Sequence, residues 1–419
     1  MPDARRWTQL AVLALVAHFA VQQIQVAREL GDRLSPIADR YSEANAVRAV
    51  DGYRARGLRS NAGLPDSAFG GRFPRAGHEP LAPDGYVDTH YPPGPMWLAY
   101  GTASTCGTER IACLRILPLT VGAAALAAFA LGLVASLGPA RGALATLAVL
   151  PVPLVTNMMH GLHYQGYAFA LLLVQTLLVL RFYERGARSW RRLGSACFAL
   201  GFLQGWLSFD YFFLVALCPM PFAALLSDLG RREPRRVVLG LVACGVAGFA
   251  LAHGLHFLQV VVFRGGLAAA AADLLGSARE RFDPGRTPEL RGMGLGPAQT
   301  DPLIVASFYL QVVSAHPNFF GFRLGGLLLA LLACSFLLGG RSFPIRGARL
   351  RVTLGDARPW EAALALGTAV ACLWIVSMRG HALAHQHFIP RHLFLAYFVG
   401  VYATLRSVRV ERASAQGSD

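Results

Sequence analysis

The sequence predicts an all-α integral-membrane protein with about ten transmembrane helices and a large first outer loop. Two observations lead to this fold class. Hydrophobic residues make up 54% of the 419 residues and charged residues only 15%, whereas soluble domains average about 25% charged residues. The apolar residues also form separate runs of roughly 20 residues, the length that a helix needs to cross a bilayer. We expect residues 1–419 to form one polytopic domain.

The first predicted span covers residues 8–28 and follows Arg5 and Arg6. It has no small-residue cleavage site, and three Gln follow its apolar part, so we expect a retained helix rather than a signal peptide. The next stretch, residues 29–110, is hydrophilic and predicts a large first outer loop. Within it, the spacing of apolar residues over 35–58 predicts an amphipathic helix on the membrane surface.

Beyond this loop, nine further apolar runs predict nine more spans. They cover residues 112–137, 142–158, 162–182, 193–209, 211–227, 237–262, 320–339, 360–378 and 388–405. A second long outer loop, residues 264–318, separates two of these spans. Its alanine-rich run at 267–275 predicts a short helix at the membrane interface.

The distribution of Arg predicts which way the loops face. The net charge is +15, and every basic residue apart from His is Arg. If the N-terminus is inside, the short inner segments hold twenty Arg, whereas the short outer turns hold only Arg379. Cytoplasmic loops of membrane proteins carry this excess, so we expect both termini in the cytoplasm and both long loops outside. The rule also accounts for the basic composition, and we expect no nucleic-acid partner.

Two of the seven Cys, Cys106 and Cys113, lie at the end of the first loop. They can form a disulfide if this side is oxidising, and the alternative is a pair of free thiols. The other five Cys lie in apolar runs, where Cys behaves as a small buried hydrophobe.

The candidate catalytic residues are two acids near the start of the first loop. Asp39 and Glu43 are four residues apart, so they share one face of the predicted helix. A carboxylate just beyond the first span suits a general base. The alternative is two surface acids that are stabilised by the helix dipole.

The stretch YVDTHYPPGP at residues 86–95 is the second candidate motif. Pro92 and Pro93 stiffen the chain and favour an extended Tyr91. We expect this rigid segment to present Asp88, His90 and Tyr91 to a substrate. The alternative is an aromatic corner in which His90 only hydrogen-bonds backbone.

Further polar residues lie at the predicted outer ends of the spans. Ionisable groups near a bilayer are costly and are therefore functional candidates, although each can instead be a snorkelling end-residue. The candidates for substrate binding are His163, Asp210, Arg379, His387 and Arg391. Arg suits bidentate contact with phosphate, and a lipid phosphate lies at this depth.

The spacing of His381, His385 and His387 invites comparison with a zinc site, because histidines four apart share a helix face. No Glu stands between them as in a metalloprotease motif, and we identify no third ligand. A divalent metal is therefore not indicated, and we expect no cofactor.

Taken in chain order, these motifs resemble the GT-C class of membrane glycosyltransferases, which includes protein O-mannosyltransferase-like and aminoarabinose-transferase-like enzymes. The resemblance extends over nearly the whole chain. Its segments are DRYSEANAVRA (39–49), THYPPGPMWL (89–98), CLRILPLTVG (113–122), GFLQGWLSFDYFFLVALCP (201–219) and HFIPRHLFL (387–395). In three places the chain departs from the class: Asp39 and Glu43 are not adjacent, Gly94 replaces a Leu, and Asp210 replaces a Lys.

The resemblance implies an inverting transfer of sugar from a polyprenyl-phosphate donor to a cell-envelope acceptor, in a multi-pass protein of the bacterial inner membrane. Glu43 or Asp39 would deprotonate the acceptor, and cations would stabilise the departing phosphate. The partners would be the donor, the acceptor and membrane lipid. Nucleotide-binding motifs are absent.

Two alternatives remain: a transporter or flippase, and a non-catalytic subunit with the same fold. Transport would favour paired polar residues in the middle of spans. In this chain most polar residues lie at span ends and in outer loops.

Overall fold

The computed structural model describes twelve segments of the chain, and within them the fold is largely helical. These segments are residues 2–33, 40–67, 87–107, 110–150, 164–185, 190–207, 211–226, 235–282, 342–345, 348–352, 357–378 and 394–412. Four helical stretches are long and apolar enough to cross a bilayer, namely Arg5–Leu30, Ile111–Leu137, Gly166–Glu184 and Arg235–Arg264. The fold is therefore helical, with four helices that indicate a membrane protein by their length and composition, and the number of ten spans stays a prediction.

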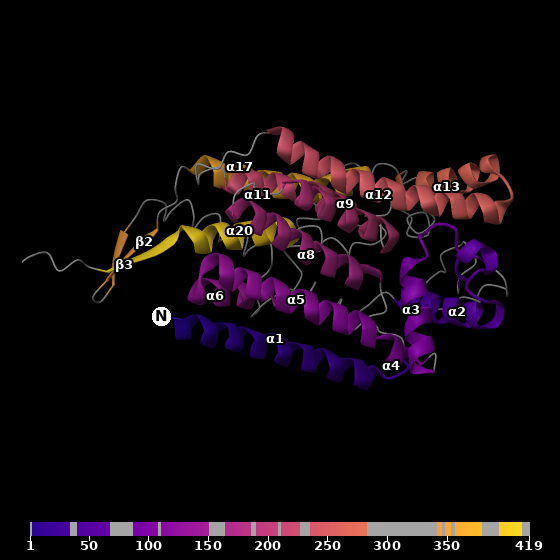
Figure 1. The fold of residues 1–419 in the computed structure, drawn as a ribbon, viewed down its shortest axis with the longest axis horizontal. Coiled ribbons are helices and arrows are strands. Elements are labelled where there is room, and N and C mark those ends of the chain that lie inside the picture. Colours follow the sequence, from indigo (N-terminus) through magenta and orange to yellow (C-terminus); the bar gives the residue numbers. More distant parts are fainter. Residues whose placement is uncertain are drawn as a thin grey trace, which may run out of the picture.

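The helices and strands outside the apolar helices lie at two ends of the molecule, which we call the loop end and the tail end (Figure 1). The loop end carries α2 (Arg40–Arg56), the short helix η1 (Ser60–Gly63), α3 (Gly94–Cys106), α4 (Ile111–Leu114) and α13 (Leu267–Phe282). The tail end carries the start of α1 (Pro2–Leu30) and three strands. The described parts of the two predicted long outer loops thus lie at the same end of the molecule.

Between the two ends lie the apolar helices. They are α5 (Ile116–Leu137), α6 (Pro139–Val149), α8 (Tyr164–Arg185), α9 (Trp190–Leu207), α10 (Phe212–Leu217), α11 (Pro219–Leu226), α12 (Arg235–Arg264), α17 (Ala357–Ser377) and α20 (Phe394–Ser407). Each overlaps a predicted apolar run. The run 211–227 forms two helices rather than one, because Pro219 has no N–H to continue the first. The predicted span 320–339 lies outside the described residues.

Helix α20 is central to the main apolar core. The Phe398 ring lies 5.0 Å from the Phe129 ring of α5 and 6.0 Å from the Phe222 ring of α11, measured between centroids. Phe394, one turn earlier, lies 5.0 Å from Phe169 of α8. These tilted and edge-on contacts are favourable for aromatic rings and hold the last helix among three earlier ones.

Helices α9 and α12 pack closely through glycine. A Cβ added to Gly201 of α9 would overlap the carbonyl oxygen of Gly245, and one added to Gly248 of α12 would overlap the carbonyl oxygen of Phe198. Small residues allow membrane helices to approach in this way. The crossing fixes α12, whose last turns reach the loop end (Figure 1).

The three strands form a small antiparallel sheet that the prediction of an all-α fold did not contain. β2 (Ala348–Val352) pairs with β1 (Ser342–Ile345) on one side and with β3 (Val408–Arg412) on the other. In β3, Val408 and Val410 alternate with the charged residues Arg409 and Glu411, the period of a strand, but the pairing of β3 with β2 joins segments that are distant in sequence. With both termini expected in the cytoplasm, the stretch between the predicted spans 320–339 and 360–378 and the stretch after 388–405 are both expected to be inner, and the sheet pairs strands from the two.

Helix α2 lies within the range 35–58 that was predicted to be helical, and its apolar face contacts other helices of the loop end. Ala46 and Val50 pack against Ala99 and Ala103 of α3 and Leu114 of α4. The loop therefore has a small core of its own beside the apolar helices.

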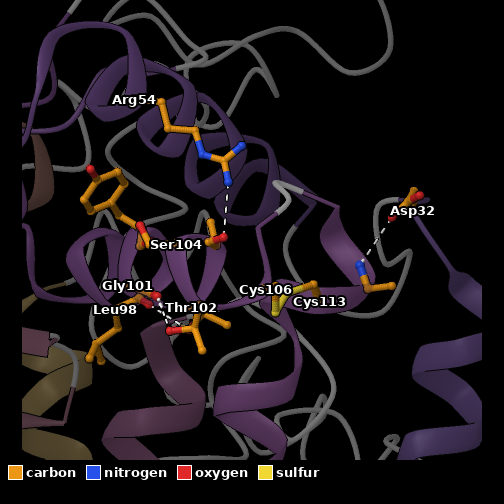
Figure 2. Close-up of a disulfide and its surroundings, with 12 residues drawn as sticks. Asp32, Arg54, Leu98, Gly101, Thr102, Ser104, Cys106 and Cys113 are labelled. Carbon is orange, nitrogen blue, oxygen red and sulfur yellow. Dashed lines mark hydrogen bonds between the residues drawn. A yellow bond between two sulfur atoms is a disulfide. The ribbon is translucent and has the colours of Figure 1, made fainter.

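Cys106 and Cys113 form a disulfide, which decides between the two alternatives for these thiols. Figure 2 shows the bond at the turn between α3 and α4. Arg54 of α2 donates to the Ala103 carbonyl oxygen at 3.1 Å in the last turns of α3. The disulfide and this hydrogen bond join three helices of the loop end.

Candidate functional site

Glu43, one of the two predicted catalytic acids, lies in a buried ion pair with Arg115. The Arg115 Nε donates to Glu43 Oε1 at 3.1 Å and its Nη2 donates to Oε2 at 2.9 Å, and both side chains are 0% exposed. Arg115 also donates to the carbonyl oxygens of Gly31 and Arg33 at 2.8 Å each. One guanidinium thus ties the end of α1, the start of α2 and the entry to α5 together.

This geometry bears on the predicted role of Glu43. Each carboxylate oxygen accepts a charged hydrogen bond, an arrangement that is stronger than a neutral one. A proton acceptor must be within hydrogen-bond reach of the group that it deprotonates. A catalytic role for Glu43 would require Arg115 to release it first, so the observed contacts favour a role in holding the loop. Asp39 lies outside the described residues.

The second candidate motif is described from Val87 onward. Val87 forms an isolated antiparallel bridge with Asp66, and the Asp88 N–H donates to the Pro65 carbonyl oxygen at 2.9 Å. Helix α3 then begins at Gly94, where a Cβ would overlap the Trp206 carbonyl oxygen of α9. The glycine at position 94 therefore has a packing reason, because only glycine permits this approach.

Residues 61–63 form a turn in the left-handed backbone conformation, shortly before Pro65, whose carbonyl oxygen bonds this motif. Asn61 and Ala62 have φ values of 51° and 56°, which are unfavourable for residues with a Cβ. Three side chains hold the turn: Tyr53 and Trp97 donate to the Gly63 carbonyl oxygen at 2.9 and 2.8 Å, and Gln259 donates to the Ala62 carbonyl oxygen at 3.2 Å. Strained turns of this kind persist where surrounding contacts enforce them.

Burial raises the pKa of the Tyr53 phenol well above its ordinary value, and the charges of Asp66 and Asp88 add to the effect, whereas the contact with Trp97 opposes it. The phenol therefore stays protonated over the physiological range and donates its hydrogen bond.

Thr89 joins the first loop to α12 and α13. Its hydroxyl donates to Asp273 Oδ2 at 2.7 Å, and its carbonyl oxygen lies 3.0 Å from His256 Nε2. Arg264 places both Nε and Nη2 at 2.9 Å from the same Oδ2 of Asp273. His90 Nε2 lies 3.9 Å from Asp273 Oδ1. We call Asp88, Thr89, His90, His256, Arg264 and Asp273 the Thr89 cluster.

The cluster is partly open to solvent. The side chains of His90 and Asp273 are 29% and 19% exposed, and Asp88 is half-buried, while its Oδ1 accepts from the His90 N–H at 2.8 Å. Asp88 and His90 were predicted substrate-binding residues, and the structure brings them together. Tyr91 is half-buried beside them in the same segment.

Sequence reasoning missed Arg115, His256, Arg264 and Asp273. Two signals were present: His256 is an ionisable residue inside an apolar run, and Asp273 interrupts the alanine-rich run of α13. His256 and Asp273 contact Thr89 across 167 and 184 residues of sequence. These contacts depend on how α12 is placed, and the local spacing of residues does not predict them.

The other predicted site residues, His163, Asp210, Arg379, His387 and Arg391, lie outside the described residues. Within the described part of the chain, no group of three or more His, Cys, Asp or Glu is arranged to hold a metal ion.

No protein-family model, no curated protein and no solved structure matches this chain. The resemblance to GT-C glycosyltransferases therefore rests on the motifs alone.

Proposed function

We propose that the chain is an integral-membrane glycosyltransferase of the bacterial inner membrane, with both termini in the cytoplasm and the loop end in the periplasm. It moves a sugar from a polyprenyl-phosphate donor to a cell-envelope acceptor. The observation that carries the proposal is the Thr89 cluster, a partly open group of carboxylates and imidazoles at the end of apolar helices. A lipid-linked sugar would present its polar group at this level, and its chain would remain in the bilayer.

Three further features support this function. The first loop has its own core and a disulfide, which is expected of a segment that faces an oxidising compartment. The left-handed turn at residues 61–63 is held under strain beside the cluster, and such strain concentrates at functional sites. Residues 87–95 are fixed by hydrogen bonds on one side and by α9 on the other.

The proposed reaction needs one base and a means of stabilising the leaving phosphate. The acceptor hydroxyl oxygen attacks the anomeric carbon as the carbon–oxygen bond to the phosphate breaks, which inverts that carbon. The hydroxyl proton goes to a carboxylate, and Asp39 is the acid of the first loop that we propose for this step, with Glu43 as the residue that holds α2. Arg391 and Arg379 are the proposed contacts for the phosphate.

The experiment uses the purified full-length protein in detergent with polyprenyl-phosphate hexoses and pentoses and a cell-envelope extract as acceptor. We expect consumption of one donor with release of polyprenyl phosphate, and loss of this activity in D39N. R110Q is the matched control, because Arg110 is exposed in the same loop. If no donor is consumed, the proposed function is wrong. If D39N retains full turnover, Asp39 is not the base.

A flux measurement in proteoliposomes addresses the alternative of transport. Movement of a lipid-linked sugar between leaflets without transfer to an acceptor would replace the proposed function by that of a flippase.

A further inference from the structure

Helix α1 has an exposed face that carries polar side chains. The helix lies at one edge of the apolar helices (Figure 1) and contacts α4, α5 and α6. Its residues Ala11, Ala14, His18, Gln22 and Gln25 are all exposed. They follow one another at intervals of three or four residues, so they share one side of the helix. We call these five residues the polar face of α1.

The depth of the polar face follows from the neighbouring helix. Arg115, which directly precedes α5, donates to the Gly31 carbonyl oxygen just after α1, so the end of α1 and the start of α5 lie at one level. At a rise of about 1.5 Å per residue, Gln22 lies about 12 Å and His18 about 18 Å from Leu30 along the helix. Half of the hydrocarbon core of a bilayer measures about 15 Å. In a membrane-spanning α1, both side chains therefore lie deep in the bilayer.

The polar face keeps hydrogen-bonding capacity after its side chains pair with each other. The Gln22 amide nitrogen donates to His18 Nε2 at 3.2 Å, so the hydrogen of the neutral ring is on Nδ1. This bond uses one N–H of Gln22 and leaves the other N–H and the carbonyl oxygen of the amide. Gln25, one turn later, adds a second amide. Lipid tails offer no partner to such groups, and leaving them unpaired in hydrocarbon is costly.

Helix α12 shows what a lipid-facing side looks like in this chain. It is also long and apolar enough to cross a bilayer, but its polar residues His253, His256 and Gln259 are buried or half-buried. Its exposed residues between positions 239 and 262 are all apolar, namely Leu239, Ala243, Val246, Ala247, Ala250, Leu251, Gly254, Leu255, Leu258 and Val262. The polar face of α1 differs from this pattern, which indicates contact with another helix rather than with lipid.

We propose that the polar face of α1 is the contact between two copies of the chain in a symmetric dimer. Both copies are inserted in the same direction, so a two-fold axis along the membrane normal brings each residue to the depth of its counterpart. A Gln amide both donates and accepts, so Gln22 and Gln25 of one copy can bond the same residues of the other. The small side chains of Ala11 and Ala14 let the two backbones approach closely.

The charges at the end of α1 support a second copy as the partner. Arg28 and Glu29 are adjacent and both are exposed. In two parallel copies of α1, the Arg28 of each copy can therefore meet the Glu29 of the other, and opposite charges that face each other favour the correct partner. A second copy thus supplies both the matching charges and the matching amides at the same depths.

The predicted span 320–339, which lies outside the described residues, fits the polar face less well by its composition. Among residues 324–339, only Cys334 and Ser335 have polar side chains. Residues that are adjacent in a helix do not share a face, whereas His18, Gln22 and Gln25 extend over two turns of α1. This span therefore has too few polar groups to pair with all three.

The test is oxidative cross-linking of the full-length protein in liposomes. A14C places a thiol on the polar face, and A250C is the matched control, because Ala250 is exposed on the apolar side of α12. Wild type under the same oxidant measures the background from the free thiols of the chain, which include the exposed Cys372. We expect a disulfide-linked dimer in A14C, because residues that face each other across a two-fold axis come within disulfide range, and only background in A250C.

Energy transfer between labelled copies in the same liposomes tests the hydrogen bonds. We expect the apparent association constant to fall about 10-fold in H18L/Q22L, because two residues lose their hydrogen bonds across the contact. A14L should also weaken association by keeping the backbones apart, whereas A250L should leave it unchanged. Thermal unfolding of each variant separates lost association from lost folding.

The inference is overturned if A14C forms no more dimer than wild type, or if A250C forms as much as A14C. It is also overturned if H18L/Q22L associates as tightly as wild type, because the polar side chains would then have no part in the contact. In A14C, a disulfide to Cys334 of the same chain would show that the span 320–339 covers the face and would exclude the dimer contact. None of these outcomes depends on whether the protein transfers a sugar.

Discussion

The loop end holds two pairs of arginine and carboxylate that use the same chemistry in opposite ways. In the closed pair, Arg115 places its two nitrogens on different oxygens of Glu43, and both side chains are fully buried. In the open pair, Arg264 places both nitrogens on one oxygen of Asp273, and the other oxygen is left without a hydrogen bond among the described residues. The closed pair is sealed from solvent with both oxygens engaged, whereas the open pair keeps one oxygen without a hydrogen bond in a side chain that is 19% exposed.

The difference shows why the type of residue alone does not identify a site. Glu43 and Asp273 are both acids at the loop end, and the sequence favoured Glu43 because it lies in the first loop near Asp39. What separates them is whether both carboxylate oxygens are engaged or only one, and the access of solvent. We therefore expect the closed pair to control stability and the open pair to control binding.

The largest expected effect is that of R115M on stability. This change leaves the Glu43 carboxylate buried without its cation, which costs about 3–5 kcal/mol in comparable buried pairs. The free energy of unfolding in detergent measures the loss. The double variant E43L/R115M should recover most of it, because two apolar side chains can replace a buried pair.

R110M is the matched control for this prediction. Arg110 pairs with Asp32 at 3.4 Å in the same loop, but their side chains are 74% and 51% exposed. Exposed pairs contribute about 1 kcal/mol or less. If R110M and R115M destabilise the protein equally, burial does not distinguish the closed pair.

A smaller effect is expected from G248A at the crossing of α9 and α12. The added methyl group would overlap the Phe198 carbonyl oxygen and push apart the helices that place His256 and Arg264. We expect a loss of about 1–3 kcal/mol, measured by thermal unfolding in detergent. This result would show that the open pair depends on packing deep among the apolar helices.

G254A tests the same helix where a Cβ would meet nothing within 4 Å. Alanine is the better helix former by about 1 kcal/mol, so G254A should be neutral or stabilising. A loss in G254A as large as that in G248A would mean that α12 tolerates no substitution, and the packing explanation would be wrong.

The smallest expected effect on stability is that of D273N. The amide keeps an oxygen for the Thr89 hydroxyl but loses the charge that attracts Arg264, and the net cost of such a change is about 1 kcal/mol. Thermal unfolding should therefore separate D273N from R115M clearly. If D273N lowers the free energy of unfolding as much as R115M does, the two pairs contribute equally to stability, and the distinction between the closed and the open pair is wrong.

Much of the fold follows from local sequence. The apolar runs predict helices because backbone groups in a bilayer must be satisfied within the segment, and α1, α5, α8 and α12 lie where such runs were found. The helix α2 follows from the spacing of Ala44, Val47, Val50 and Tyr53. The sheet does not follow, because β2 and β3 are paired across more than fifty residues.

The candidate site was predicted in part. Asp88 and His90 were recognised because prolines follow them, and rigid polar segments suit binding. His256 and Asp273 were not, since each taken alone reads as a polar residue in an apolar helix. Asp39, His163, Asp210, Arg379, His387 and Arg391 remain sequence predictions.

By itself, the sequence determined that this chain is a helical membrane protein with a polar first loop, because hydrophobicity and chain length act locally. The tertiary structure alone decided the role of each acid. It paired Glu43 with Arg115 across 72 residues and joined Thr89 to Asp273 across 184. A carboxylate is available for binding only when it is accessible and keeps an oxygen that is not engaged, and both conditions depend on contacts between residues that are far apart in the chain.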